Sequence, residues 1–190
     1  MALMEWMIMN ARARTVVVGV GNEFRRDDGV GWAVVALLRE RAQHRADGPG
    51  SEVEFTVSDG DPARLIDMWR GADLCVVVDA AHAHPGRPGR VHRLELRKGT
   101  PAPAASASTH GMGLGEAVEL SRALDSLPAR LVVFAVEGED TSLGTGLSTS
   151  VRNAVTPLAE RVEREIGAAP SLDTAREGSS TAGVSDGRSG

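Results

Sequence analysis

Hydrophobic and polar positions along this chain follow two periods, one typical of strands and one typical of helices. Short apolar or alternating runs predict strands at Thr15–Val20, Glu52–Val57, Leu74–Val78, Arg90–Leu96 and Arg130–Val136. Apolar residues at helical spacing predict helices at Gly29–Arg45, Asp61–Arg70, Thr109–Ser126 and Ser148–Ile166. This alternation predicts an α/β fold: a mostly parallel, twisted sheet of about five strands with helices on both faces.

The patterns also indicate where individual strands lie and where a ligand would bind. The continuous apolar run Leu74–Val78 is typical of a central strand buried on both faces, whereas Arg90–Leu96 alternates like an edge strand. In such sheets, ligands bind beyond the carboxyl ends of the strands. The predicted functional edge therefore consists of the loops that follow Val20, Val57, Val78 and Val136.

The chain of 190 residues fits one domain. We expect an N-terminal extension over residues 1–13 and a single α/β domain over 14–167. Residues 168–190 are rich in Ser, Gly and Ala and lack periodicity, so we expect a disordered tail there.

Composition excludes several classes of function. The net charge of −5 provides no basic footprint for nucleic acid, and the single cysteine, Cys75, excludes an internal disulfide. The apolar stretch Met1–Met9 is too short to span a membrane, and its arginines follow the apolar part, which is the wrong order for a secretory signal. Aromatic residues make up only 3% and suggest no sticky patch. We expect a cytoplasmic monomer with no membrane or nucleic-acid partner.

A glycine-rich turn between Gly19 and Gly31 joins the first strand to the first helix. A dinucleotide fingerprint would place a third glycine where Phe24 stands, and a phosphate loop would carry a lysine, which this segment lacks. A bound phosphate would also meet the charges of Asp27 and Asp28. A cation or a proton-transfer role fits this turn better, with helix capping as the equal alternative for each aspartate.

Other candidate ligands occur at later loops on the same predicted edge. They are Glu23 in the first loop, Asp59 and Asp61 in the second, Asp79 with His82 and His84 in the third, and His110 at a helix start. A set of two aspartates and a histidine suits Zn²⁺, Ni²⁺ or Fe²⁺ better than Mg²⁺. Capping or local packing is the alternative for Asp79 and His110, and solvation for the other histidines.

Five segments occur in an order that resembles one known family. They are Val18–Asn22 with Asp27–Gly31, Asp59-Gly60, Val78–Ala80, Thr109–Leu114 and Gly146–Ser148. Together they resemble the hydrogenase maturation endopeptidases, which trim the C-terminal extension from the large subunit of nickel–iron hydrogenases. The resemblance spans about residues 14–166 and implies a phosphorylase/hydrolase-like α/β fold and peptidase activity on the large-subunit precursor.

The resemblance also implies a set of site residues. Matched by motif position, Asp28, Asp79 and His110 are the metal ligands and catalytic residues. The metal is then nickel supplied by the substrate, and zinc or cadmium can occupy the site in vitro. Whether metal-bound water or a carboxylate base drives hydrolysis stays open. The alternatives are a non-proteolytic metal-binding maturation chaperone and a nucleotide- or phosphate-binding α/β module.

Overall fold

The computed structural model describes residues 13–44, 53–100 and 112–168. Nearly all of the predicted N-terminal extension and C-terminal tail lies outside these residues, as does His110. The predicted domain boundaries therefore stay predictions.

The sheet has the strand order β2-β1-β3-β5-β4. Its strands are β1 (Thr15–Val20), β2 (Val53–Ser58), β3 (Leu74–Ala81), β4 (Val91–Arg97) and β5 (Arg130–Glu137). Four strands run parallel, and β4 pairs antiparallel with β5 at the edge. The predicted five-stranded, mostly parallel sheet with an edge strand near Arg90 is thus confirmed.

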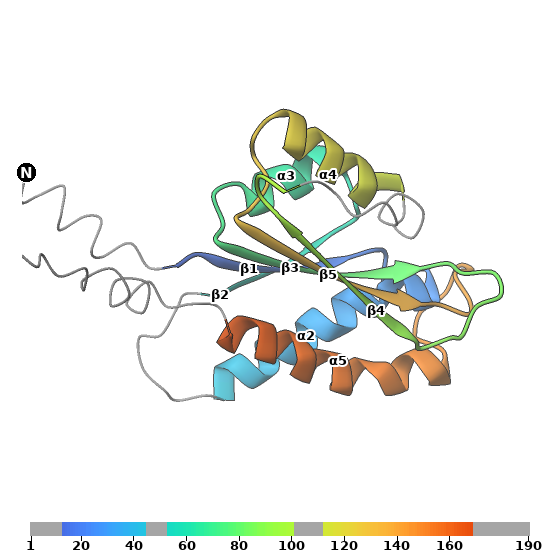
Figure 1. Ribbon diagram of the computed structural model, residues 1–190. Helices are drawn as coiled ribbons and strands as arrows, with labels where there is room; N and C mark the ends of the chain where they lie inside the picture. The colour runs from blue at the N-terminus through green and yellow to red at the C-terminus, as the bar shows by residue number, and fades with distance from the viewer. Residues whose placement is uncertain (1–12, 45–52, 101–111, 169–190) are drawn as a thin grey trace, which may run out of the picture.

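Helices cover both faces of the sheet, as predicted (Figure 1). The described residues form four α-helices, α2 (Val30–His44), α3 (Pro62–Trp69), α4 (Met112–Ala123) and α5 (Thr149–Gly167), and one 3₁₀ turn, η1 (Arg26–Gly29). Figure 1 shows α3 and α4 on one face and α2 and α5 on the other. None of the helices in this part of the chain is long and apolar enough to cross a membrane.

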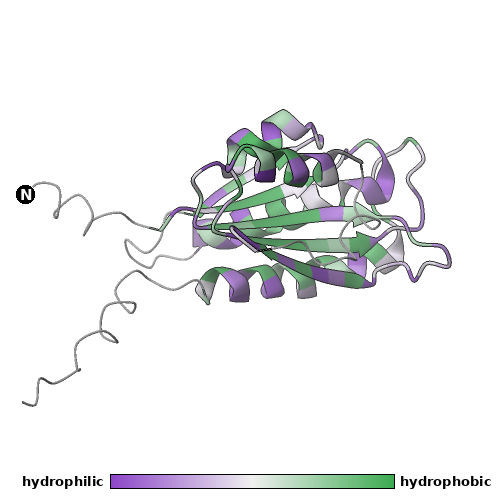
Figure 2. Ribbon diagram, turned by 45° about the horizontal axis from the view of Figure 1, so that its top comes forward, coloured by the Kyte–Doolittle hydropathy of each residue, from purple (hydrophilic) through white to green (hydrophobic). Residues whose placement is uncertain are grey.

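Each face of the sheet carries its own hydrophobic cluster, because successive side chains of a strand point to opposite faces. Val16 and Val18 of β1 pack into the cluster beneath α3 and α4, whereas Val17 packs into the cluster with α2 and α5. Figure 2 shows the resulting apolar strands between helices whose outer faces are polar. This two-sided burial explains the continuous apolar runs of the central strands.

The structure differs from the sequence prediction at the end of β3. The predicted strand stops at Val78, but β3 continues to Ala81, and Asp79 lies inside it. The reason is tertiary: β5 extends alongside and pairs Asp79 with Ala135 and Ala81 with Glu137. The loop between β3 and β4 is correspondingly shorter than the predicted strand ends imply.

Candidate active site

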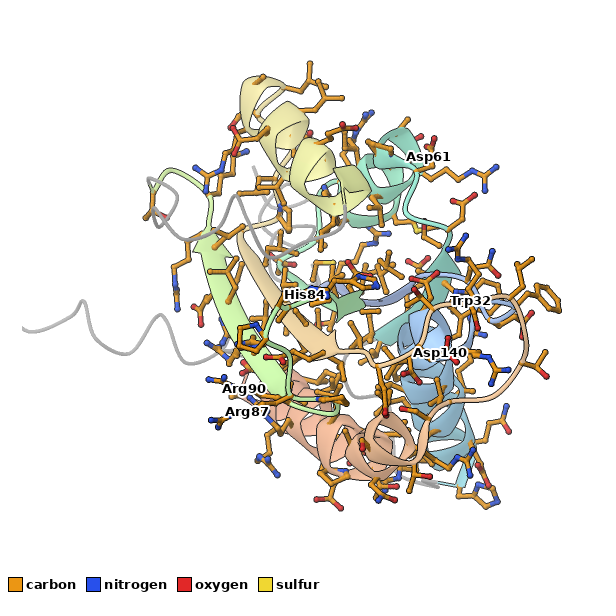
Figure 3. The ribbon with its side chains drawn as sticks, turned by 90° about the vertical axis from the view of Figure 1, so that its right-hand side faces the viewer. Trp32, Asp61, His84, Arg87, Arg90 and Asp140 are labelled. Atoms are coloured by element: carbon orange, nitrogen blue, oxygen red, sulfur yellow. The ribbon has the colours of Figure 1, made fainter. Side chains whose placement is uncertain are left out.

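The loops at the carboxyl ends of the parallel strands carry the predicted site. Figure 3 looks onto this edge and shows Trp32 and Asp140 on one side of it and His84, Arg87 and Arg90 on the other. Asp28 belongs to η1, which follows β1, and Asp79 belongs to the neighbouring strand β3. The fold therefore brings two of the three predicted ligands to one edge of the sheet.

Close backbone contacts fix the glycine turn that holds Asp28. A Cβ atom on Gly31 would lie 2.5 Å from the carbonyl oxygens of both Val20 and Val78, so only glycine lets α2 start against the two strand ends. Gly21 has a φ of 123°, and a Cβ there would lie 1.9 Å from the carbonyl oxygen of Asp28. Trp32 donates from Nε1 to the carbonyl oxygen of Gly21 at 3.0 Å. The predicted role of these glycines, close backbone approach, is thus evident, and it serves the fold around Asp28.

Asp79 is the buried member of the pair. It is only 5% exposed and shares a sheet face with Cys75 and Val77, whose side chains pack beneath α3 and α4. Burial raises the pKa of Asp79 to about 7; a hydrogen bond from the Ala80 backbone acts against this rise, and the negative charge of Asp28 adds to it. An aspartate held in this way has a high free energy as a bare carboxylate, and a cation shared with Asp28 would lower it.

The start of α4 lies on the same side of the sheet. Gly113 approaches the preceding loop so closely that a Cβ on it would be 2.1 Å from the carbonyl oxygen of Gly60. A Cβ built on Gly60 would in turn lie 3.5 Å from the side chain of Val20, at the end of β1. The first described turn of α4 is therefore packed against the carboxyl ends of β1 and β2. His110 precedes this turn but lies outside the described residues, so its role as a ligand stays a prediction.

Asp27, the neighbour of Asp28, has a structural role. Its buried carboxylate accepts hydrogen bonds from the backbone N–H groups of Glu139 (2.9 Å), Asp140 (3.0 Å) and Ser148 (2.7 Å). Burial alone would raise the pKa of Asp27, but these hydrogen bonds outweigh it and leave the pKa below its usual value. Asp27 therefore ties the first loop to the loop between β5 and α5. Sequence reasoning offered helix capping or chemistry for this residue, but the backbone groups that it binds lie in the distant segment between β5 and α5 and not at the start of its own helix.

The second loop also has a structural explanation. Asp61 caps α3, because its carboxylate accepts a hydrogen bond from the backbone N–H of Arg64 at 2.9 Å. Asp59 is exposed and pairs with the guanidinium of Arg64 at 3.4 Å. These contacts account for both carboxylates without a ligand.

One histidine of the third loop, His82, and the histidine of β4, His92, have partners of their own. His82 lies 3.3 Å from the hydroxyl of Thr141, and His92 lies 2.6 Å from a carboxylate oxygen of Glu137. Glu137 is buried, and hydrogen bonds from the Arg87 backbone and from His92 lower its pKa. Sequence reasoning missed Glu137, although an acid that directly follows the apolar run of β5 is the same signal that singled out Asp79. Within the described residues, no three His, Cys, Asp or Glu side chains gather closely enough to hold a metal ion.

The structure is thus an α/β protein with two carboxylates, Asp28 and Asp79, at the carboxyl edge of its sheet. A family model described as HycI: Hydrogenase maturation protease matches residues 34–165. Because this match covers well over half of the chain, the chain belongs to the hydrogenase maturation protease family. It is accordingly a peptidase of hydrogenase maturation, which confirms the family, activity and enzyme class that the sequence resemblance implied.

Solved structures agree with this assignment at the level of the fold. The hydrogenase maturating endopeptidase HybD from E. coli is 24% identical with a TM-score of 0.62, and the similarity covers 81% of this chain and 94% of that one. The [NiFe] hydrogenase maturation protease HybD from Thermococcus kodakarensis is 21% identical with a TM-score of 0.59, covering 80% and 98%. A [NiFe] hydrogenase maturation protease HycI from the same organism is 21% identical with a TM-score of 0.56, covering 86% and 99%. No curated protein sequence matches the chain significantly.

Proposed function

We propose that this protein removes the C-terminal extension from the nickel-loaded precursor of a hydrogenase large subunit, and that it holds the precursor's nickel with Asp28, Asp79 and His110. The observation that carries the ligand assignment is the pairing of a buried aspartate, Asp79, with the nearby charge of Asp28 at the carboxyl edge. The nickel belongs to the substrate and marks the precursor as ready for cleavage.

The chemistry of this donor set suits nickel. Two carboxylates and one imidazole match the borderline character of Ni²⁺ and leave coordination positions for the ligands that the precursor itself contributes. The two negative charges also repel each other in a partly buried setting, so a shared divalent cation relieves a cost that the empty pair carries. Zn²⁺ and Cd²⁺ satisfy the same donors and are useful probes.

Hydrolysis then depends on where the scissile bond is held. Binding of the precursor's metal by Asp28 and Asp79 would place the adjacent peptide bond at the sheet edge and make the reaction effectively intramolecular. Water attacks the carbonyl carbon, the carbon–nitrogen bond breaks, and the leaving amine takes up a proton. A carboxylate oxygen that is not engaged with metal can accept the proton of the attacking water.

The single thiol of the chain does not offer a competing nucleophile. Cys75 is the second residue of β3 and is fully buried, and burial raises the pKa of its thiol far above the usual value. A thiol of this kind is protonated at neutral pH and out of reach of a polypeptide. Cys75 therefore contributes packing, as its place in the apolar run predicts.

The direct test is incubation of the protein with nickel-loaded, unprocessed large subunit, followed by mass spectrometry of the large subunit. We expect shortening at its C-terminus. A nickel-free precursor is the control and should stay intact. If the nickel-loaded cognate precursor keeps its full mass, the proposed function is wrong.

Calorimetric titration with Ni²⁺, Zn²⁺ and Cd²⁺ tests the ligand set separately. We expect Asp28→Asn and His110→Ala each to weaken binding by about 10–100-fold, because each removes one donor from the site. His84→Ala, which removes an exposed histidine from the same edge, is the matched control and should bind like the wild type. Equal affinity of the wild type and both ligand variants would contradict the assignment.

A further inference from the structure

Two of the large apolar side chains on the surface lie in loops at the functional edge. Phe24 is 62% exposed in the loop between β1 and η1, and Leu143 is 80% exposed in the loop between β5 and α5. Such side chains are unremarkable when scattered singly. Here the two loops are joined, which sets this pair apart.

Backbone hydrogen bonds hold the two residues side by side. Arg25 and Gly144 form a parallel β-bridge, in which Gly144 donates to the carbonyl of Phe24 (2.9 Å) and Arg26 donates to the carbonyl of Gly144 (3.0 Å). In this register Phe24 and Leu143 immediately precede the two bridged residues, so the bridge holds their backbones beside each other at the functional edge. We call this pair, Phe24 and Leu143, the apolar platform.

The platform is rigidly attached to the site. The Arg26 guanidinium contacts the hydroxyl of Ser142 at 3.1 Å and the carboxylate of Asp140 at 3.2 Å. Arg26 also adopts a φ of 46°, a conformation that non-glycine residues rarely take and that the surrounding contacts must hold in place. Two residues on, the backbone N–H of Asp28 donates to the carbonyl of Arg25 at 3.0 Å. The bridge that supports the platform thus also positions a proposed metal ligand.

The size of the platform favours a transient polypeptide partner over a second copy of this chain. The two side chains together expose on the order of 200–300 Å², whereas a stable dimer buries roughly 800 Å² on each partner. An extended segment of a substrate polypeptide, which must be held beside the proposed ligands only until it is cleaved, requires no larger contact.

We infer that the apolar platform docks an apolar segment of the large-subunit precursor next to the bond that is cleaved. This inference rests on the proposed function and specifies how the polypeptide part of the substrate is recognised. The metal ligands hold the nickel, and the platform holds the chain that leads to or away from it.

The test compares the double variant Phe24→Ser/Leu143→Ser with Leu120→Ser/Leu124→Ser. The control removes leucines of similar exposure, 44% and 57%, at α4 and just beyond its end, away from the loops of the site. We expect the platform variant to raise KM for the nickel-loaded precursor by at least about 10-fold with little change in kcat, and the control to match the wild type. Thermal unfolding of both variants reports whether each is folded.

The outcomes separate this inference from the proposed function. If the wild type cleaves the precursor and the folded platform variant keeps the wild-type KM, the docking inference is wrong while the peptidase function stands. If the wild type does not cleave, precursor binding measured by biolayer interferometry decides: selective loss in the platform variant supports docking, and equal binding overturns it. A wild-type dimer that only the platform variant dissociates would also overturn it.

Discussion

Replacement of Asp79 by asparagine is expected to reduce cleavage of the nickel-loaded precursor by at least about 100-fold, because it removes the charge of a proposed metal ligand while keeping the shape of the side chain. The same substitution should leave the protein as stable as the wild type or more stable. Asp79 is 5% exposed and its ionised form is disfavoured by burial and by the charge of Asp28, so a neutral side chain relieves a cost of the folded state. Mass spectrometry of the precursor and thermal unfolding measure the two effects.

The combination of lost activity and retained stability is what identifies a functional residue. A residue that mattered only for folding would lose both together. Asp67→Asn, at an exposed carboxylate of α3 whose side chain is 75% exposed, is the control and should change neither. Full-rate cleavage by Asp79→Asn would rule out Asp79 as a ligand.

Asp27→Asn is expected to have the opposite profile, a loss of stability of about 3 kcal/mol. The Asp27 carboxylate accepts three backbone hydrogen bonds in a buried position, whereas an asparagine would turn an N–H group toward donors of the same kind. For a chain of this length we expect the melting temperature to fall by about 6–12 °C. Thermal and urea unfolding measure the change.

The matched comparison for this prediction is again Asp67→Asn. Its carboxylate makes only an exposed ion pair with Arg70 at 3.3 Å, so its loss should alter the free energy of unfolding by less than about 1 kcal/mol. Unfolding of Asp27→Asn at the wild-type temperature would show that the three hydrogen bonds do not brace the loops.

Asp27 and its neighbour Asp28 show which features of the site can be predicted from the sequence. The glycine turn and the acids that follow it are local features that leave each aspartate between capping and chemistry, and the family resemblance then implies Asp28, not Asp27, as the ligand. The partners of Asp27 lie more than a hundred residues away, in the loop between β5 and α5. Periodicity and spacing do not report which distant loop meets a given side chain, so the structural role of Asp27 could not be predicted.

The candidate site was predicted in part for the same reason. Asp28 and Asp79 lie at one edge because Asp28 follows β1 and Asp79 lies near the carboxyl end of the parallel strand β3, an arrangement that the alternation of elements predicts. The sequence analysis did not find buried Glu137, whose surroundings depend on how β4 pairs with β5. It also did not find the bridge between Arg25 and Gly144, which depends on how two distant loops meet. The place of His110 relative to the carboxylates stays a prediction.

The sequence by itself determined the fold class, the positions of the strands and helices to within a few residues, and the family. The physical reason is that burial on both faces of a parallel sheet and on one face of each helix imposes a regular spacing of hydrophobic residues, which is visible in the sequence. Only the tertiary structure decided that β3 continues through Asp79, that Asp27 braces two loops, and that a backbone bridge joins the loops of Phe24 and Leu143. Each of these depends on hydrogen bonds between segments far apart in the chain, and the local spacing of hydrophobic and polar residues does not indicate which distant segments form them.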